Sequence, residues 1–303
     1  MRYLVIGAGA TGGCIAGYLH KAGKKVTLIA RGTNLKEIQK NGLRIKTING
    51  MIHEKNMDVI DEERYQGKAD VIFVCVKDYS LMQVLTLIQQ ASHQNTVVIP
   101  ILNVYGTGER LSRVLPSCDV LDGCIYIAAR KVADGVYQQK GEIFRIVFGR
   151  RDGDIQDDRL IQIQQDLKES GILPILSKHI KRDAFQKYSF VSAMAASGAY
   201  LDANAGAFKY DQISRRLFIS CVKEIDSLAN AMGISFQVDI VKENLKIMDN
   251  LLDDFVSSMQ NDLVEGRETE MDGLVFEVVR LGEKYQVPVP QYMKIAKYFG
   301  MEI

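Results

Sequence analysis

Residues 3–13 read YLVIGAGATGG, and this stretch decides the fold of the chain. Its first four residues are all apolar, which is typical of a parallel strand that is buried on both faces. Apolar residues then recur at helical spacing through residues 15–22, and a second apolar strand follows at residues 25–30. Strand, glycine-rich turn, helix and strand within thirty residues predict the start of a Rossmann-type parallel sheet.

The glycines have the positions that a dinucleotide requires. Gly7 permits the tight turn after the strand, Gly9 lets a pyrophosphate approach the backbone, and Gly12 lets helix and strand pack closely. The first turn of the helix supplies free N–H groups and a partial positive charge for the phosphates. We therefore predict that a dinucleotide binds at the loop formed by Gly7, Ala8, Gly9, Ala10, Thr11 and Gly12.

The end of the second strand indicates which dinucleotide binds. An NAD site usually has Asp or Glu there to bind the ribose 2′-hydroxyl, whereas this strand ends Ile29-Ala30-Arg31 and has no carboxylate. An arginine at this point can pair with a 2′-phosphate. The sequence therefore favours NADP (as NADPH) over NAD.

Two more apolar strands are predicted at residues 69–76 and 96–102. Lys77 and Asn103 follow them directly, at the strand ends where open α/β sheets bind ligands. Lys77 could therefore reach a phosphate or the adenine edge, and Asn103 a nicotinamide ribose or a substrate carbonyl. We expect short strands near 124–128, 135–139 and 143–149, a helix over 157–170, and a last strand of the same sheet at 172–176.

From about residue 181 the pattern is helical, with almost no strand signals. Helices are expected over 183–199, 211–232 and 239–259, and Thr269 is expected to cap a helix that ends near residue 284. The predicted fold class is α/β: an N-terminal Rossmann-type parallel-sheet domain followed by an all-α domain. The expected domains are an NADP-binding domain, 1–178, and a helical domain for substrate binding and dimerisation, 179–303.

Composition excludes several classes of protein. The 303 residues contain 38 Lys and Arg against 37 Asp and Glu, so the chain lacks the basic excess of a nucleic-acid binder. Five cysteines without CxxC spacing and four histidines give no disulfide framework and no metal site. The N-terminal apolar run imitates a signal peptide, but five glycines between residues 7 and 17 disfavour its helix. No uncharged apolar run reaches the length of a membrane span. We expect a cytoplasmic protein with reduced thiols, no membrane contact and a possible homodimer.

Several stretches together resemble the ketopantoate reductase (2-dehydropantoate 2-reductase) family over nearly the whole chain. The resemblance rests on the glycine loop with Arg31, on Val76-Lys77, on Leu102-Asn103 with Gly106, on the Lys187 helix, on Ser257–Asp262 followed by Thr269–Gly273, and on Val287–Pro290. It implies an NADPH-dependent enzyme that reduces ketopantoate, a small-molecule 2-oxo acid, to pantoate for coenzyme A synthesis.

The resemblance also implies a role for individual residues. Lys187 would be the general acid that protonates the new alkoxide, and Glu270 would hold the substrate hydroxyl, help to order Lys187 and contact the cofactor. Ser258 would bind the substrate carboxylate, and Asn103 would bridge cofactor and substrate. Arg31 and Lys77 would bind NADPH together with the glycine loop.

The chain departs from the family's pattern at substrate-binding positions. Val191 and Ala195 stand four and eight residues after Lys187, on the same helix face, where the family usually has Asn. Another family Asn corresponds to a position near Ala205, beside Asn204. The family's Asn-Gly after the fourth strand is Asn103-Val104 in this chain.

Each substrate hydrogen bond that these replacements remove costs about 1–3 kcal/mol of binding free energy. Three alternatives therefore stay open besides ketopantoate. The substrate could be a more apolar 2-oxo acid, the enzyme could be a dehydrogenase of 3-hydroxy acids on the same architecture, or the protein could be a non-catalytic NADP-binding sensor.

Overall fold

The computed structural model describes residues 1–302, which form two compact units. The first unit contains Met1–Leu102 and Gly106–Ile180. The second contains Asn103–Tyr105 and the chain from Lys181 onward. The sequence analysis placed a single domain boundary after residue 178. It did not predict that residues 103–105 belong to the second unit.

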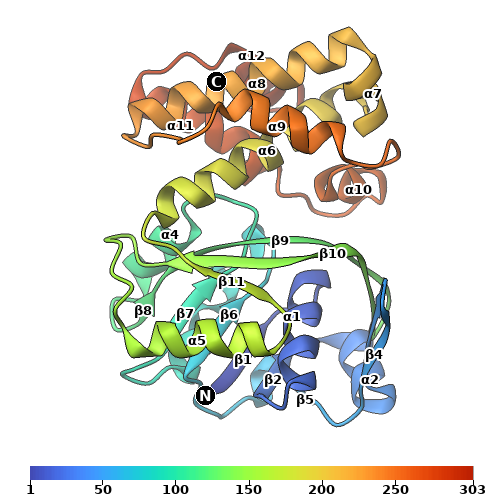
Figure 1. Ribbon diagram of the computed structural model, residues 1–303, viewed down its shortest axis with the longest axis vertical. Helices are drawn as coiled ribbons and strands as arrows, with labels where there is room; N and C mark the ends of the chain where they lie inside the picture. The colour runs from blue at the N-terminus through green and yellow to red at the C-terminus, as the bar shows by residue number, and fades with distance from the viewer. Residues whose placement is uncertain (303) are drawn as a thin grey trace. The chain divides into compact units, whose positions relative to one another are not determined.

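A six-stranded parallel sheet is the framework of the first unit (Figure 1). The strand order is β5-β2-β1-β6-β7-β8, which confirms the predicted Rossmann-type sheet. The strands are β1 (Arg2–Ile6), β2 (Lys25–Ile29), β5 (Asp58–Ile60), β6 (Val71–Val74), β7 (Val97–Pro100) and β8 (Asp119–Val120). Along β1, Tyr3 and Val5 enter one hydrophobic core while Leu4 and Ile6 enter another. Burial on both faces therefore explains why Tyr3–Ile6, the buried part of β1, is entirely apolar.

A second sheet covers one face of the parallel sheet, with helix α1 (Ala10–Lys21) between them. Its order is β11-β10-β3-β4, with β9 paired to β10. Its strands are β3 (Leu43–Thr47), β4 (Gly50–Glu54), β9 (Asp122–Ala133), β10 (Val136–Gly149) and β11 (Leu173–Leu176). Helices α3 (Leu85–Ala91) and α4 (Thr107–Val114) pack on the opposite face of the parallel sheet. The unit also contains α2 (Gly32–Asn41), α5 (Asp158–Glu169) and the short turns η1 (Glu62–Arg64), η2 (Asp78–Ser80) and η3 (Met82–Val84).

Two sequence predictions for the first unit were wrong in detail. The strand near residues 172–176 exists as β11, but it pairs in parallel with β10 and so belongs to the second sheet. The three short strands expected between residues 124 and 149 are one long hairpin, β9–β10. Gly135, with φ of +67°, makes the turn between them, in a conformation that favours glycine.

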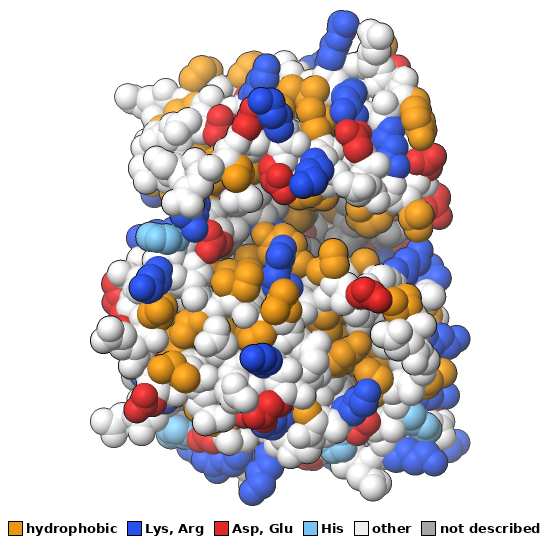
Figure 2. Space-filling model, in the orientation of Figure 1, with side chains coloured by type: hydrophobic (Ala, Val, Ile, Leu, Met, Phe, Trp, Pro, Cys, Tyr) orange, Lys and Arg blue, Asp and Glu red, His pale blue; other side chains and the backbone are white. Residues whose placement is uncertain are grey.

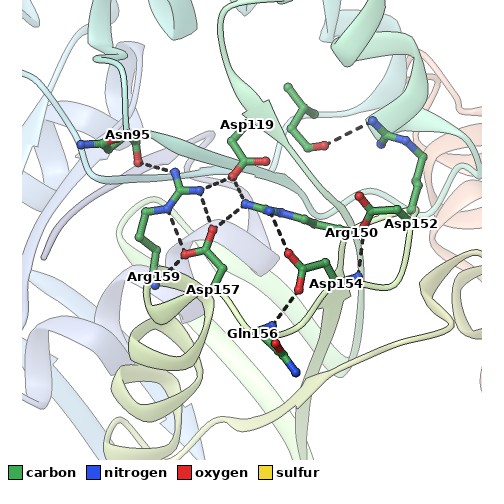
Figure 3. A network of polar contacts seen from close by, with 10 residues as sticks. Asn95, Asp119, Arg150, Asp152, Asp154, Gln156, Asp157 and Arg159 are labelled. Carbon is green, nitrogen blue, oxygen red and sulfur yellow. Dashed lines mark hydrogen bonds and ion pairs between the residues drawn. The ribbon is translucent and has the colours of Figure 1, made fainter.

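A network of ion pairs connects β8, the end of β10 and α5 (Figure 3). Asp157 caps α5 by accepting a hydrogen bond from the backbone N–H of Arg159 at 2.8 Å, and Arg150 lies 2.6 Å from its carboxylate. Arg159 also reaches Asp119 at 2.8 Å. The hydrogen bond with the Arg159 side chain holds the pKa of Asp157 down at about 2. Each cation therefore has carboxylate partners, and the network serves the fold.

The surface agrees with the charge balance of the sequence. Figure 2 shows Lys and Arg side chains interspersed with Asp and Glu, with hydrophobic side chains between them. Exposed hydrophobic residues of α5, β10 and β11 include Ile143, Ile161, Leu173 and Ile175.

Among the described residues of the second unit, every regular element is a helix or a π-helical turn, as predicted. It contains α7 (Ala205–Tyr210), α8 (Gln212–Ala231), α9 (Ile240–Asp249), α10 (Ser258–Val264), a π-helix η4 (Asp272–Phe276), α11 (Glu277–Tyr285) and α12 (Pro290–Tyr298). Helix α6 (Ile180–Leu201) belongs to this unit from Lys181 onward, and its first residue, Ile180, belongs to the first unit.

The single helix expected over 239–259 is wrong. Helix α9 ends at Asp249, and α10 begins only at Ser258. Ser257 and Gln260 form a capping box, in which each side chain bonds the other residue's backbone N–H, so the chain starts a new helix there.

The helix that Thr269 was expected to cap begins at Met271 and contains the π-helical turn. Two hydroxyl groups of α6 hold this turn. Tyr188 donates to the carbonyl of Gly273 at 2.8 Å, and Ser192 donates to the carbonyl of Leu274 at 2.7 Å. Val104 fills the space beside Gly273, where an added Cβ would lie only 2.5 Å from its Cγ2. Residues 103–105 are thus anchored in the second unit by side-chain packing.

This contact predicts that Gly273→Ala lowers the free energy of unfolding by about 1–3 kcal/mol, because the new methyl group would overlap Val104. In a Val104→Ala background the same substitution should cost less than about 1 kcal/mol, because the two overlapping methyl groups are gone. Urea denaturation of the wild type, both single variants and the double variant measures the coupling. Strictly additive losses would contradict the packing described.

Candidate functional site

The glycine loop lies between β1 and α1, where the sequence placed it. Gly7 has φ of +105°, a backbone conformation that favours glycine. A Cβ on Gly12 would lie 2.0 Å from the Gly7 carbonyl oxygen, so only glycine permits this approach. A Cβ on Gly9 would meet nothing within 4 Å, which leaves open space beside the loop. Among residues 1–302 no side chain caps α1, so the helix terminus can receive an anion.

Two residues that the sequence analysis missed hold this loop in place. Tyr137 on β10 donates a hydrogen bond to the carbonyl of Ala8 at 2.9 Å, and Asn34 on α2 donates to the same carbonyl at 3.1 Å. Asn34 also accepts from the backbone of Gly135 at 2.8 Å. Burial raises the pKa of Tyr137 to about 12, so its hydroxyl remains a donor at neutral pH. These partners lie far from the loop in sequence, and no local pattern could have identified them.

The other predicted cofactor ligands of the first unit lie at strand ends. Arg31 follows β2 and stands at the N-cap of α2, where its guanidinium forms an ion pair with Glu62. Lys77 lies three residues after the end of β6, at the start of η2, and is half-buried. Both positions are at the carboxyl edge of the parallel sheet, where dinucleotides bind in this fold.

The second unit brings two of the predicted residues into direct contact. Lys187 on α6 donates a hydrogen bond from Nζ to Oδ1 of Asn103 at 2.7 Å. The lysine is 9% exposed, so its amine is largely withdrawn from solvent. A buried ammonium requires polar partners, and the amide oxygen of Asn103 provides one. Eighty-four residues separate the two side chains, and anchoring of residues 103–105 in the second unit makes the contact possible.

Glu270 and Ser258 also belong to the second unit. Glu270 is 4% exposed and directly precedes the helix that begins at Met271. Ser258 is the exposed first residue of α10, next to the capping box. The carboxylate of Glu270 is therefore buried near the π-helical turn, whereas the side chain of Ser258 is exposed.

The departures on α6 differ in their exposure. Val191 is half-buried, whereas Ala195 is completely buried in the core of the second unit. Ala205 is completely buried as well, and Asn204 caps α7 by accepting from the backbone of Ala207 at 3.0 Å. Of these four residues, Val191 is therefore the one whose side chain combines partial exposure with a position one helical turn from Lys187.

The described residues were searched for metal-ligand groups and for membrane-spanning helices. Residues 1–302 contain no group of three or more His, Cys, Asp or Glu side chains that could hold a metal ion. Within the same residues, no helix combines the length and the apolar character needed to cross a membrane. All five cysteines are free thiols.

The two units correspond to the two parts of one protein family. The family model described as ketopantoate reductase PanE/ApbA matches residues 3–153, and its C-terminal counterpart matches residues 179–299. An uncharacterized oxidoreductase of Bacillus subtilis, YkpB, is 27% identical over 96% of this chain and 95% of its own length. A 2-dehydropantoate 2-reductase of Halobacterium salinarum is 24% identical over 98% of this chain and 97% of its own.

Solved structures show the same fold. The ternary structure of D-mandelate dehydrogenase with NADH and anilino(oxo)acetate superposes with a TM-score of 0.89 at 22% identity, covering 98% of this chain and 96% of that one. This likeness confirms the fold, and the family match along both units gives the class of reaction. The chain belongs to the ketopantoate reductase family and is an oxidoreductase that acts on a CH–OH group.

Proposed function

We propose that this protein reduces a 2-oxo acid with NADPH, and that ketopantoate is the first substrate to test. The observation that carries the proposal is the hydrogen bond between Lys187 and Asn103 at 2.7 Å. It presents a buried amine, the group that can protonate an alkoxide, beside an amide that can contact cofactor and substrate. The 2-dehydropantoate 2-reductase of Halobacterium salinarum supports the choice of ketopantoate.

The residues of the first unit fit a dinucleotide. The space beside Gly9 and the uncapped start of α1 suit a pyrophosphate, and Arg31 suits a 2′-phosphate. In this unit we assign cofactor binding to Gly7, Ala8, Gly9, Ala10, Thr11, Gly12, Arg31 and Lys77. Asn103 and Glu270 are assigned to cofactor binding by the family resemblance alone. NADPH, when bound, supplies the hydride that reduces the carbonyl carbon.

The chain's own residues handle the oxygen and its proton. Reduction of a ketone places negative charge on the former carbonyl oxygen, and the Lys187 ammonium stabilises that charge and then donates a proton to it. Asn103 accepts from Nζ and so fixes the direction of the ammonium group. In this proposal Glu270 holds the product hydroxyl and helps to order the lysine, and Ser258 binds the substrate carboxylate.

A second substrate class has a specific observation in its favour. Val191 presents a half-buried apolar side chain one turn from Lys187, where the resemblance led us to expect Asn. The structural neighbour D-mandelate dehydrogenase was solved with anilino(oxo)acetate, a 2-oxo acid derivative that carries an aromatic group. A 2-oxo acid with an apolar side chain is therefore the alternative substrate.

NADPH absorbance tests these possibilities. It should fall when NADPH reduces ketopantoate or an aromatic or branched 2-oxo acid, and it should rise when NADP oxidises a 3-hydroxy acid. Turnover of ketopantoate supports the leading proposal, and turnover of an apolar 2-oxo acid alone supports the alternative. Oxidation of a 3-hydroxy acid without reduction of any 2-oxo acid would contradict both. NADPH binding without any turnover would identify a sensor instead of an enzyme.

Removal of the Lys187 amine should lower kcat by about 10²–10⁴-fold, because a positioned general acid contributes that much to proton transfer. Lys187→Met keeps the length of the side chain, and Lys223→Met, an exposed lysine on α8, is the matched control. Steady-state kinetics with the best substrate measure the effect. Unchanged kcat in Lys187→Met would refute the assigned role.

Tyr137→Phe removes the hydroxyl that holds the Ala8 carbonyl, so the dissociation constant for NADPH should rise about three- to tenfold, as expected for one net hydrogen bond. Tyr18→Phe is the matched control, because Tyr18 bonds Gln139 at 2.7 Å and not the loop. Fluorescence titration with NADPH measures both variants. Equal affinities for the two would show that the loop does not depend on Tyr137.

A further inference from the structure

The residue assigned to the 2′-phosphate already has an anionic partner. The guanidinium of Arg31 forms an ion pair with the carboxylate of Glu62, the first residue of the short turn η1. The two side chains are 54% and 28% exposed, so solvent and ligands can reach both. Any anion that binds Arg31 therefore meets Glu62 at the same place.

The sheet register explains why these side chains meet. Strands β2 and β5 are parallel neighbours, with Ile29 opposite Ile60, and the N–H of Ala30 donates to the carbonyl of Ile60 at 3.1 Å. Arg31 stands two residues after Ile29, and Glu62 stands two residues after Ile60. Both side chains consequently leave the sheet at the same edge and at the same level.

The turn that carries Glu62 is itself held in place. The side chain of Asp61 accepts a hydrogen bond from the backbone N–H of Glu63 at 3.2 Å and so caps the turn. The carboxylate of Asp61 is therefore hydrogen-bonded to the backbone of the turn, whereas the side chain of Glu63 is exposed to solvent. Glu62 is the carboxylate of this acidic run that lies against Arg31.

A carboxylate at this edge has a defined chemical preference. In NAD sites an acidic residue after the second strand binds the ribose hydroxyls, and in NADP sites an arginine binds the 2′-phosphate. The end of β2 lacks a carboxylate, but Glu62 supplies one from the turn that follows the neighbouring strand β5. A phosphate monoester carries close to two negative charges at neutral pH, so Glu62 repels it while Arg31 attracts it.

We propose that Glu62 is a cofactor-specificity residue that opposes the 2′-phosphate of NADPH and accepts hydrogen bonds from the ribose hydroxyls of NADH. This inference rests on the proposed function, which places the dinucleotide at this edge of the sheet. An exposed ion pair is weak, so the pair with Arg31 opens readily for either ligand. The protein therefore binds NADH as well as NADPH, and the two opposed charges set the ratio of their affinities.

Equilibrium binding tests this without reference to turnover. Dissociation constants for NADPH and NADH are measured by fluorescence titration at fixed ionic strength for the wild type, Glu62→Gln and Glu63→Gln. Glu62→Gln should tighten NADPH by about fivefold or more, since one like charge is removed, and should weaken NADH by about two- to fivefold. Glu63→Gln, which removes the same charge one residue away, should change both constants by less than about twofold.

Arg31→Ala completes the design. This variant should weaken NADPH far more than NADH, and Glu62→Gln should tighten NADPH less in the Arg31→Ala background than in the wild type, because Glu62 can no longer neutralise the arginine. Thermal unfolding of each variant confirms that the binding changes come from folded protein. The opposite signs for the two cofactors separate a specificity role from a general loss of affinity.

Several results would overturn the proposal. These are equal changes for both cofactors in Glu62→Gln, the same response from Glu63→Gln, and failure of the wild type to bind NADH. Failure of the proposed function is recognised separately, as absence of turnover with every 2-oxo acid. If the wild type binds both nucleotides but reduces no 2-oxo acid, the reductase proposal fails, and the response of Glu62→Gln still decides the role of Glu62.

Discussion

The first unit depends on the contact between helix α1 and the loop that precedes it. An added Cβ on Gly12 would lie 2.0 Å from the carbonyl oxygen of Gly7, so the helix can reach its position only with glycine there. A second close approach occurs at Gly13, where a Cβ would lie 2.5 Å from the ring of Tyr137. The same tyrosine donates to the Ala8 carbonyl. Helix packing and the position of the glycine loop therefore both depend on the absence of side chains at Gly12 and Gly13, in the first turn of α1.

The second unit depends on a segment that it receives from the first half of the chain. Residues 103–105 supply Asn103 to Lys187 and Val104 to the space beside Gly273. Tyr105 packs against Phe185, with ring centroids 4.6 Å apart. The packing of Val104 and Tyr105 thus fixes the backbone next to Asn103, whose side chain makes the polar contact with Lys187. The amide of Asn103 lies beside the lysine because its neighbours are held. Val104 therefore has a structural function at a position where the family pattern has glycine.

Local sequence patterns predicted the fold well, because the decisive signals are short-range. The glycine loop, the apolar strands and the helical second half could all be read from spacing and composition. The β11 pairing, the break after Asp249 and the contacts of Asn34 and Tyr137 could not, because each depends on partners distant in sequence or on caps overlooked in a helical pattern. Lys187 was singled out by resemblance alone, since a lysine on a helix carries no local signal. Its roles, and those of the other site residues, remain predictions.

The two departures from the family pattern on α6 differ in burial. Val191 and Ala195, four and eight residues after Lys187, stand where the family usually has Asn. From the sequence, both replacements were expected to make a substrate pocket less polar. Ala195, however, is completely buried in a hydrophobic core, where an unpaired amide would cost about 1–3 kcal/mol and could not contact a ligand without repacking. Val191 is half-buried, so a side chain at this position can contact a ligand without repacking of the core. On the Lys187 face of α6, the departure from the family pattern that a ligand could contact is therefore Val191. A less polar residue at this position is compatible with reduction of a 2-oxo acid whose own side chain is more apolar than that of ketopantoate.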